Sequence, residues 1–144
     1  MNIEMRVLTV RQPWAWAILH GGKDVENRVR NVAGDYRGPV AIHAGRTVDK
    51  VASMPLRAVP DSIVLRTGGI IGVVDLVDVH DAEYVHAYAF FPSAWMCSPW
   101  AEPGVNHLVL ADPRPLAHPI PFRGALGLRR LDAATIDLIT KELP

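Results

Sequence analysis

The stretch GIIGVVDLVDVH, from Gly69 to His80, carries the strongest strand signal in the chain. It is rich in Val and Ile, whose branched side chains favour an extended backbone. Its length predicts a bent strand of a small barrel. Gly72, inside the stretch, is expected to form a bulge or corner, because a residue without a side chain lets the backbone curve.

Strands and helices are predicted on both sides of this stretch. Alternating or β-rich segments predict strands at residues 6–10, 24–30, 39–44, 106–111 and 125–131, and four prolines predict an extended segment at 113–122. Helices are predicted from Pro13 to a glycine stop at Gly21 or Gly22, from Thr47 to about Ser53, over residues 81–91, and after an Asp132 cap.

This order of elements predicts an α+β fold. We expect a small, mostly antiparallel β-barrel of five or six strands with peripheral helices, formed by one domain that spans residues 1–144. In the C-terminal helix, Ile136, Ile139 and Leu143 fall on one stripe, which is expected to pack on the barrel.

Composition narrows the class of protein. The chain has 144 residues, 49% of them apolar and 21% charged, which is typical of an ordinary globular domain. Cys97 is the only cysteine, so the chain can form neither an internal disulfide nor a CxxC zinc site. No apolar run reaches membrane-spanning length, and the first residues do not resemble a signal peptide. A cytoplasmic protein without a membrane segment is predicted.

The charges balance overall but are unevenly distributed. Fifteen basic residues cancel fifteen acidic ones, which argues against general binding to duplex DNA. Residues 1–50 nevertheless hold eight Lys or Arg against five Asp or Glu, whereas residues 75–112 hold six carboxylates and no Lys or Arg. This asymmetry fits either an ordinary solvated surface or a basic lip on a ligand cleft.

Two groups of charged residues are candidates for chemistry. Lys23, Glu26 and Arg28 follow a glycine-ended helix and begin a charged strand face, which indicates either a simple surface ion pair or the mouth of a cleft. Asp75 shares strand parity with Val73 and Val77. Its carboxylate is therefore expected either to be turned outward or hydrogen-bonded structurally, or to lie on the floor of a cleft as a proton-transfer group.

A metal site is not predicted. Several potential ligands crowd into nine residues, namely Asp78, His80, Asp81, Glu83 and His86. They complete no known ligand spacing, so a solvated loop is preferred and no cofactor is expected.

The segment VLTVRQPWAWAILHGGKDVENR, residues 7–28, resembles the start of an ASCH domain in the PUA-like superfamily. The family motif GxKxxExR is matched by Gly21, Lys23, Glu26 and Arg28, and RQPWA at residues 11–15 is similar to the opening of one subgroup. AIHAG at 41–45, the stretch at 69–79 and PIPFRGALGLRRL at 119–131 are similar to later strands of the family.

The resemblance implies a PUA-like barrel with a cleft between barrel and first helix that binds RNA or a nucleoside. Lys23 and Arg28 could then hold a phosphate or ribose edge, and a tryptophan could stack on a base. The nucleotide-binding residues predicted on this basis are Arg11, Gln12, Trp14, Lys23, Glu26, Arg28, His43 and Trp100.

Two alternatives remain open. Some relatives are metal-independent amidohydrolases acting on 4-acetylcytidine, and at least one is a ribonuclease, which is the less favoured enzyme here. In a hydrolase, Lys23 would act as base or activator, and Glu26 or Asp75 would pass a proton to the leaving amine. Glu26 stands where those amidohydrolases carry Thr, and Asp75 where they carry Glu, which favours binding over catalysis. The second alternative is a protein-interaction domain using the acidic segment and the aromatic residues of 84–95.

Overall fold

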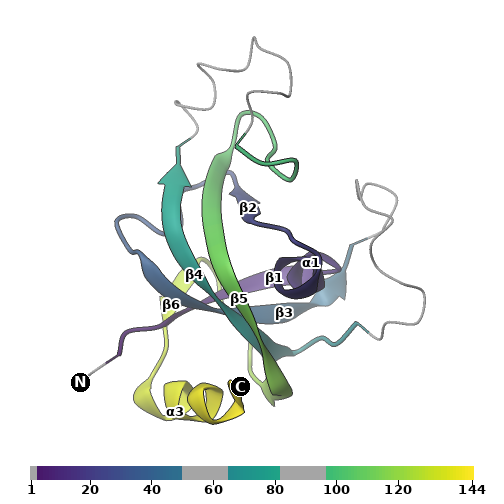
Figure 1. Cartoon of the computed structure of the whole chain (residues 1–144), viewed down its shortest axis with the longest axis vertical. Helices are drawn as coiled ribbons and strands as arrows, with labels where there is room; N and C mark the ends of the chain where they lie inside the picture. Colours follow the sequence, from purple (N-terminus) through teal and green to yellow (C-terminus); the bar gives the residue numbers. More distant parts are fainter. Residues whose placement is uncertain (1–2, 50–64, 82–96) are drawn as a thin grey trace.

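Six strands form one curved, mostly antiparallel sheet (Figure 1). The computed structural model describes residues 3–49, 65–81 and 97–144. The strands are β1 (Arg6–Gln12), β2 (Val25–Arg28), β3 (Gly38–Val48), β4 (Gly69–His80), β5 (Asn106–Pro121) and β6 (Leu128–Arg130). They are arranged in the order β2-β5-β4-β3-β1-β6, and only the β1–β3 pair is parallel.

The predicted fold class is confirmed, with one correction to the barrel. No ladder joins the edge strands β2 and β6 in the part of the chain that the structure describes, so the sheet is not closed. These strands are short, with four and three residues, and each pairs with a single neighbour. The sheet is curved like the wall of a barrel, but its two edge strands do not join to close one.

Most predicted elements are found close to their expected positions. The strand at 106–111 and the proline-rich extension after it form one continuous strand, β5, of 16 residues. The helix predicted to begin at Thr47 is wrong where the structure describes it, because Thr47 belongs to β3. The remainder of that helix, and residues 82–91 of the next predicted helix, lie outside the described residues.

The two helices cover opposite faces of the sheet. Helix α1 (Trp14–His20) packs against one apolar cluster, which includes Leu8, Ile42 and Leu76. Helix α3 (Ala133–Glu142) packs its Ile139 against the other cluster, with Val7 and Val73. Neighbouring strand residues contribute to different clusters because side chains alternate across a sheet. No helix in the described ranges is long and apolar enough to cross a bilayer.

The helix ends follow the predicted chemistry. The carboxylate of Asp132 accepts a hydrogen bond from the Thr135 backbone N–H at 2.7 Å, as expected of an N-cap. The backbone N–H of Gly21 closes the last turn of α1, and Gly22 adopts a φ of 74°, which lets the chain turn sharply toward Lys23.

Gly72 allows α1 to approach the sheet. The β4–β5 pairing shifts register between Ile70 and Gly72, which confirms the predicted bulge. A Cβ atom at Gly72 would lie 2.4 Å from a methyl carbon of Leu19 in α1 and 2.9 Å from the carbonyl oxygen of Arg114. The missing side chain therefore sets how closely α1, and with it Trp14, can lie to the strands.

Candidate functional site

A cleft of about 1050 Å³ lies between β1, the start of α1, β2 and two loops. Its walls come from five segments that are far apart in sequence and that the fold brings together. They are Thr9–Arg11 with Trp14, Lys23 with Glu26–Val29, Asp49, Pro99–Glu102, and Ala125–Gly127. Three predicted residues of the GxKxxExR motif, Lys23, Glu26 and Arg28, thus line one hollow.

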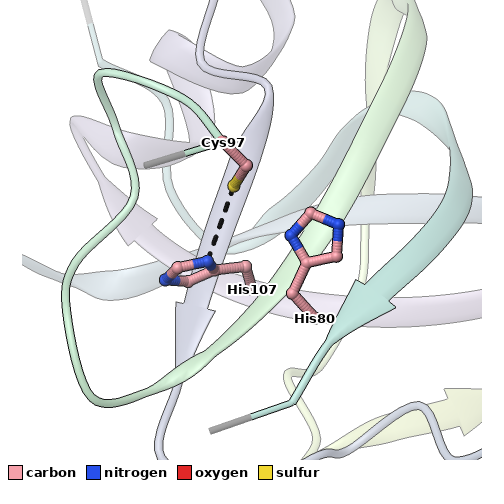
Figure 2. Close-up of side chains that lie close together, drawn as sticks. All are labelled: His80, Cys97 and His107. Carbon is pink, nitrogen blue, oxygen red and sulfur yellow. Dashed lines mark hydrogen bonds between the residues drawn. The ribbon is translucent and has the colours of Figure 1, made fainter. Parts of the chain in front are cut away.

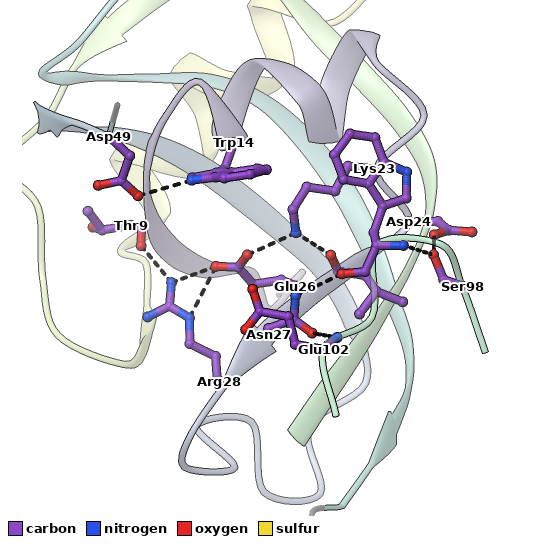
Figure 3. A network of polar contacts seen from close by, with 12 residues as sticks. Thr9, Trp14, Lys23, Asp24, Glu26, Asn27, Arg28, Asp49, Ser98 and Glu102 are labelled. Carbon is purple, nitrogen blue, oxygen red and sulfur yellow. Dashed lines mark hydrogen bonds and ion pairs between the residues drawn. The ribbon is translucent and has the colours of Figure 1, made fainter. Parts of the chain in front are cut away.

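A buried ion network lies in this cleft (Figure 3). The Lys23 ammonium lies 3.1 Å from one carboxylate oxygen of Glu26, and the Arg28 guanidinium lies 3.0 Å from the other. Lys23 is 4% exposed and Glu26 is 8% exposed. Charges removed from water to this extent need partners, and Glu26 supplies one to each cation.

The local fold explains why the three side chains converge. Lys23 follows the turn that ends α1, and its backbone N–H still bonds to the carbonyl of Ala17 at 3.0 Å. Glu26 and Arg28 point to the same side of β2 because they are two residues apart in a strand. Arg28 also donates to the carbonyl oxygen of Thr9 at 2.8 Å, which ties β2 to β1 across the cleft.

The network retains a net positive charge. Two cations and one carboxylate sum to one positive charge at formal ionisation. The ammonium of Lys23 donates to Glu26 and to the carbonyl oxygen of Val25, which uses two of its three N–H donors. The network can therefore hold one anionic or strongly hydrogen-bond-accepting group of a ligand.

Two tryptophans form an aromatic wall of the cleft. The rings of Trp14 and Trp100 meet edge to face, with centroids 6.4 Å apart. The indole N–H of Trp14 donates to Asp49 at 3.0 Å, and Asp49 also pairs with Arg11. Both rings are only partly buried, so a flat ligand can reach aromatic surface beside the ion network.

The loop with Trp100 is fastened to β2 by Asn27. The side-chain amide of Asn27 donates to the Trp100 carbonyl and accepts from the Glu102 backbone N–H, both at 2.9 Å. Ser98 adds a second link through a hydrogen bond from its hydroxyl to Asp24 at 2.5 Å. These bonds hold the aromatic wall in place against the strand that carries Glu26.

Comparison with known proteins assigns the family. The ASCH domain family model matches residues 8–119, which is most of the chain and includes the whole motif. This chain belongs to the ASCH domain family. No curated protein matches it by sequence.

Solved ASCH structures share its fold. A crystal structure of a point mutant of the ASCH protein from Zymomonas mobilis has a TM-score of 0.61 and 16% identity, covering 99% of this chain and 100% of that one. A crystal structure of ASCH from Zymomonas mobilis has a TM-score of 0.57 and 18% identity, covering 97% and 96%. At this identity the similarity concerns the fold alone.

The ASCH cleft does not bring together every predicted site residue. Arg11, Trp14, Lys23, Glu26, Arg28 and Trp100 line it, whereas Gln12, His43 and Asp75 are not among its lining residues. Gln12, 1% exposed, instead donates to the Arg66 carbonyl and accepts from the Trp16 backbone N–H. It holds the start of α1 and the segment before β4 together.

Asp75 has a structural partner away from the cleft. Its carboxylate accepts two hydrogen bonds from the Arg114 guanidinium, at 2.9 and 3.3 Å. The β5 strand bulges next to this pair, where Asp112 adopts a φ of 48° and also binds Arg114. Of the two alternatives predicted for Asp75, the structure therefore matches the structural hydrogen bond, because an irregularity in the neighbouring strand presents the carboxylate with an arginine.

His43 positions the rim of the ASCH cleft. Its Nε2 lies 2.7 Å from the Phe122 carbonyl oxygen, which can only accept, so Nε2 carries the proton and Nδ1 accepts from the Thr9 hydroxyl at 3.1 Å. Thr9 in turn accepts from the Ala125 backbone N–H at 3.2 Å. This chain of bonds fixes the segment that ends in the cleft-lining residues 125–127.

Protonation of His43 is expected to destabilise the domain. Burial lowers the pKa of His43 below its ordinary value of 6.5, and this outweighs the opposing effect of the bond to Phe122. The unfolded chain therefore takes up this proton first as the pH falls. The stability that His43 contributes is complete above about pH 6.5 and is lost progressively below it.

Urea unfolding between pH 7.5 and 5 checks this prediction. The His43→Gln variant should lose part of the decline in unfolding free energy that the wild type shows on acidification. His20→Gln, which changes an exposed histidine, should retain it. Identical pH dependence in wild type and His43→Gln would contradict the prediction.

Sequence reasoning missed several cleft residues. Thr9, Asn27, Asp49 and the 125–127 segment line the cleft but had no distinctive pattern. Asn27 offered a signal through its position inside the motif, because an amide can donate and accept at once. The acidic and histidine cluster at 78–86 is described only as far as Asp81, and the aromatic residues of the proposed protein-interaction surface lie outside the described residues.

Proposed function

We propose that the ASCH cleft binds single-stranded RNA or a modified nucleotide. The family is generally RNA-binding or nucleoside-related. The observation that carries the proposal is a buried network with net positive charge beside two partly exposed tryptophans. A nucleotide presents the matching features, namely a flat aromatic base joined to an anionic phosphate and a polar ribose.

Each part of the cleft has a role in this proposal. Trp14 or Trp100 stacks on the base, and Lys23 and Arg28 hold a phosphate or ribose oxygen. The cleft volume of about 1050 Å³ is at the upper end of the volumes of small-ligand pockets. The cleft therefore has room for one nucleotide and part of the next nucleotide in a strand.

The charge balance of the cleft favours local recognition over strong attraction to a polyanion. Arg11, Lys23 and Arg28 face an equal number of lining carboxylates, from Glu26, Asp49 and Glu102. Few phosphates can then be neutralised. We expect the logarithm of the RNA association constant to fall with the logarithm of salt concentration with a slope of about −0.7 to −1.4, the value for one or two phosphates on a single strand.

Hydrolysis of an acylated cytidine is the second candidate. The buried Lys23–Glu26 pair in a nucleoside-sized cleft favours it. Against it, both contacts of the Lys23 ammonium use N–H donors, whereas a general base must offer a lone pair. Asp75, the other predicted proton carrier, is engaged by Arg114. Binding is therefore the better-supported function.

Binding to short oligoribonucleotides of each base tests the proposal. Trp100→Leu is expected to weaken binding by roughly 5- to 150-fold, because stacking contributes about 1–3 kcal/mol per base. Lys23→Met should weaken it further and flatten the salt dependence. Trp16→Leu is the matched control, since Trp16 stacks on His20 and does not line the cleft.

Two outcomes would decide against binding by this cleft. One is the absence of affinity for every oligonucleotide and nucleoside tried, and the other is equal loss of affinity in the Trp16 and Trp100 variants. Incubation with N4-acetylcytidine, followed by chromatography of released cytidine, tests the second candidate. Release that disappears in Lys23→Met would assign hydrolysis to the cleft.

A further inference from the structure

A second group of chemically reactive side chains gathers where the segment that starts at Cys97 meets β4 and β5 (Figure 2). It consists of His80 at the end of β4, His107 in β5 and Cys97 at the beginning of the loop. The β4–β5 ladder places His80 directly opposite His107. Each residue offers one ligand atom, and these atoms all lie within 4.8 Å of one another.

The distances are close to those of a metal centre. On a tetrahedral zinc ion, a thiolate sulfur and an imidazole nitrogen are about 3.6 Å apart, and two imidazole nitrogens about 3.3 Å. The Sγ atom of Cys97 lies 3.5 Å from Nδ1 of His107. The remaining separations are at most 4.8 Å, and the Cys97 side chain is exposed and not in a disulfide.

The hydrogen bonds of His107 point its lone pair at the cysteine. Its Nε2 lies 2.5 Å from the carbonyl oxygen of Glu102, and a carbonyl can only accept, so Nε2 carries the proton. Nδ1 is then the unprotonated nitrogen, and it faces Sγ of Cys97. Metal-binding histidines typically donate their other N–H to a carbonyl or carboxylate in this way.

His80 has a similar arrangement. Its Nε2 lies 3.5 Å from a carboxylate oxygen of Asp78. Figure 2 shows its other ring nitrogen directed toward Cys97 and His107. Both imidazoles therefore have an outer partner that can orient the ring, and both turn a nitrogen toward the same point.

We propose that Cys97, His80 and His107 form a zinc site, with water as the fourth ligand. Two imidazoles and one thiolate are the donor set that suits the borderline-soft Zn²⁺ ion better than Mg²⁺ or Ca²⁺. The bound ion would tie β4 and β5 to the loop that carries Trp100. In the sequence analysis, His80 was considered only together with potential ligands close to it in sequence, and no metal site was predicted. The fold instead places His80 beside Cys97 and His107.

The full chain, freed of metal with a chelator and kept reduced, is titrated with Co²⁺ and then with Zn²⁺. One equivalent of Co²⁺ should give the intense visible bands of tetrahedral coordination and a thiolate-to-cobalt charge-transfer band. Zn²⁺ should abolish both. Cys97→Ser should lose the charge-transfer band and weaken Zn²⁺ binding by more than the roughly 10- to 100-fold cost of an outer-shell change.

Two further variants guard against a folding artefact and adventitious binding. His80→Asn should also lose the tetrahedral spectrum, while far-ultraviolet circular dichroism confirms that each variant is folded. His118→Asn changes an exposed histidine outside the cluster and should bind like the wild type. Absence of a tetrahedral spectrum in the wild type, or equal Zn²⁺ affinity in Cys97→Ser, would overturn the proposal. Neither result depends on nucleotide binding.

Discussion

Glu26→Gln is expected to lower the free energy of unfolding by about 3 kcal/mol. The substitution preserves the size of the side chain but removes the only negative charge of the buried network. The Lys23 ammonium, 4% exposed, is then left with the Val25 carbonyl and a neutral amide. An uncompensated buried charge costs more than the intact pair contributes.

Urea denaturation of the single and double variants measures this effect. Lys23→Met/Glu26→Gln removes both charges and should return to within about 1 kcal/mol of the wild type, because a buried ion pair exchanged for uncharged residues of similar volume is often neutral. The affinity of this double variant for oligonucleotides should be lower than that of the wild type, since the Lys23 cation is gone and only Arg28 is left to hold the phosphate. A double variant no more stable than Glu26→Gln would show that the network is not coupled as described.

Gly72→Ala is expected to destabilise the domain by about 1–3 kcal/mol. The new methyl group would lie 2.4 and 2.5 Å from the two terminal carbons of Leu19 and 2.9 Å from the Arg114 carbonyl oxygen. Leu19 is buried, and the carbonyl belongs to the paired strand β5, so neither can move freely. Displacement of α1 should also shift Trp14 and weaken nucleotide binding.

Gly45→Ala is the matched control for this prediction. Gly45 lies in the neighbouring strand β3, and a Cβ atom there would be 3.2 Å from a methyl carbon of Thr9, a much milder approach. Thermal unfolding should show a clearly lower midpoint for Gly72→Ala than for Gly45→Ala. Equal midpoints would mean that the close packing of α1 on β4 does not depend on the glycine.

The sequence predicted the fold better than the site. The strands and both described helices follow from local patterns, such as Val and Ile alternation in β4 and the Asp132 cap of α3. The prediction of a closed barrel was wrong, because pairing between edge strands depends on their mutual position and not on their composition. Thr47 was wrongly placed in a helix because a possible cap says nothing about the sheet that continues past it.

The predicted site residues fall into two groups, those whose partners are close in sequence and those whose partners are distant. Lys23, Glu26 and Arg28 lie within six residues of one another, so the turn after α1 and the alternation of β2 were enough to bring them together. His43 was expected in the cleft, but it bonds to Thr9 and Phe122, which are 34 and 79 positions away. Asp75, for which the cleft was one of two alternatives, meets an arginine presented by a bulge in β5. No local pattern carries such pairings.

The amino-acid sequence alone determined the family motif, the order of strands and helices, and the charges of the network, because these depend on neighbouring residues and on alternation along one strand. Only the tertiary structure decided which distant segments meet. It set Asn27 against the Trp100 loop and Cys97 against His80 and His107. The physical reason is that strand register and close backbone approach, as at Gly72, arise from packing between elements far apart in the chain.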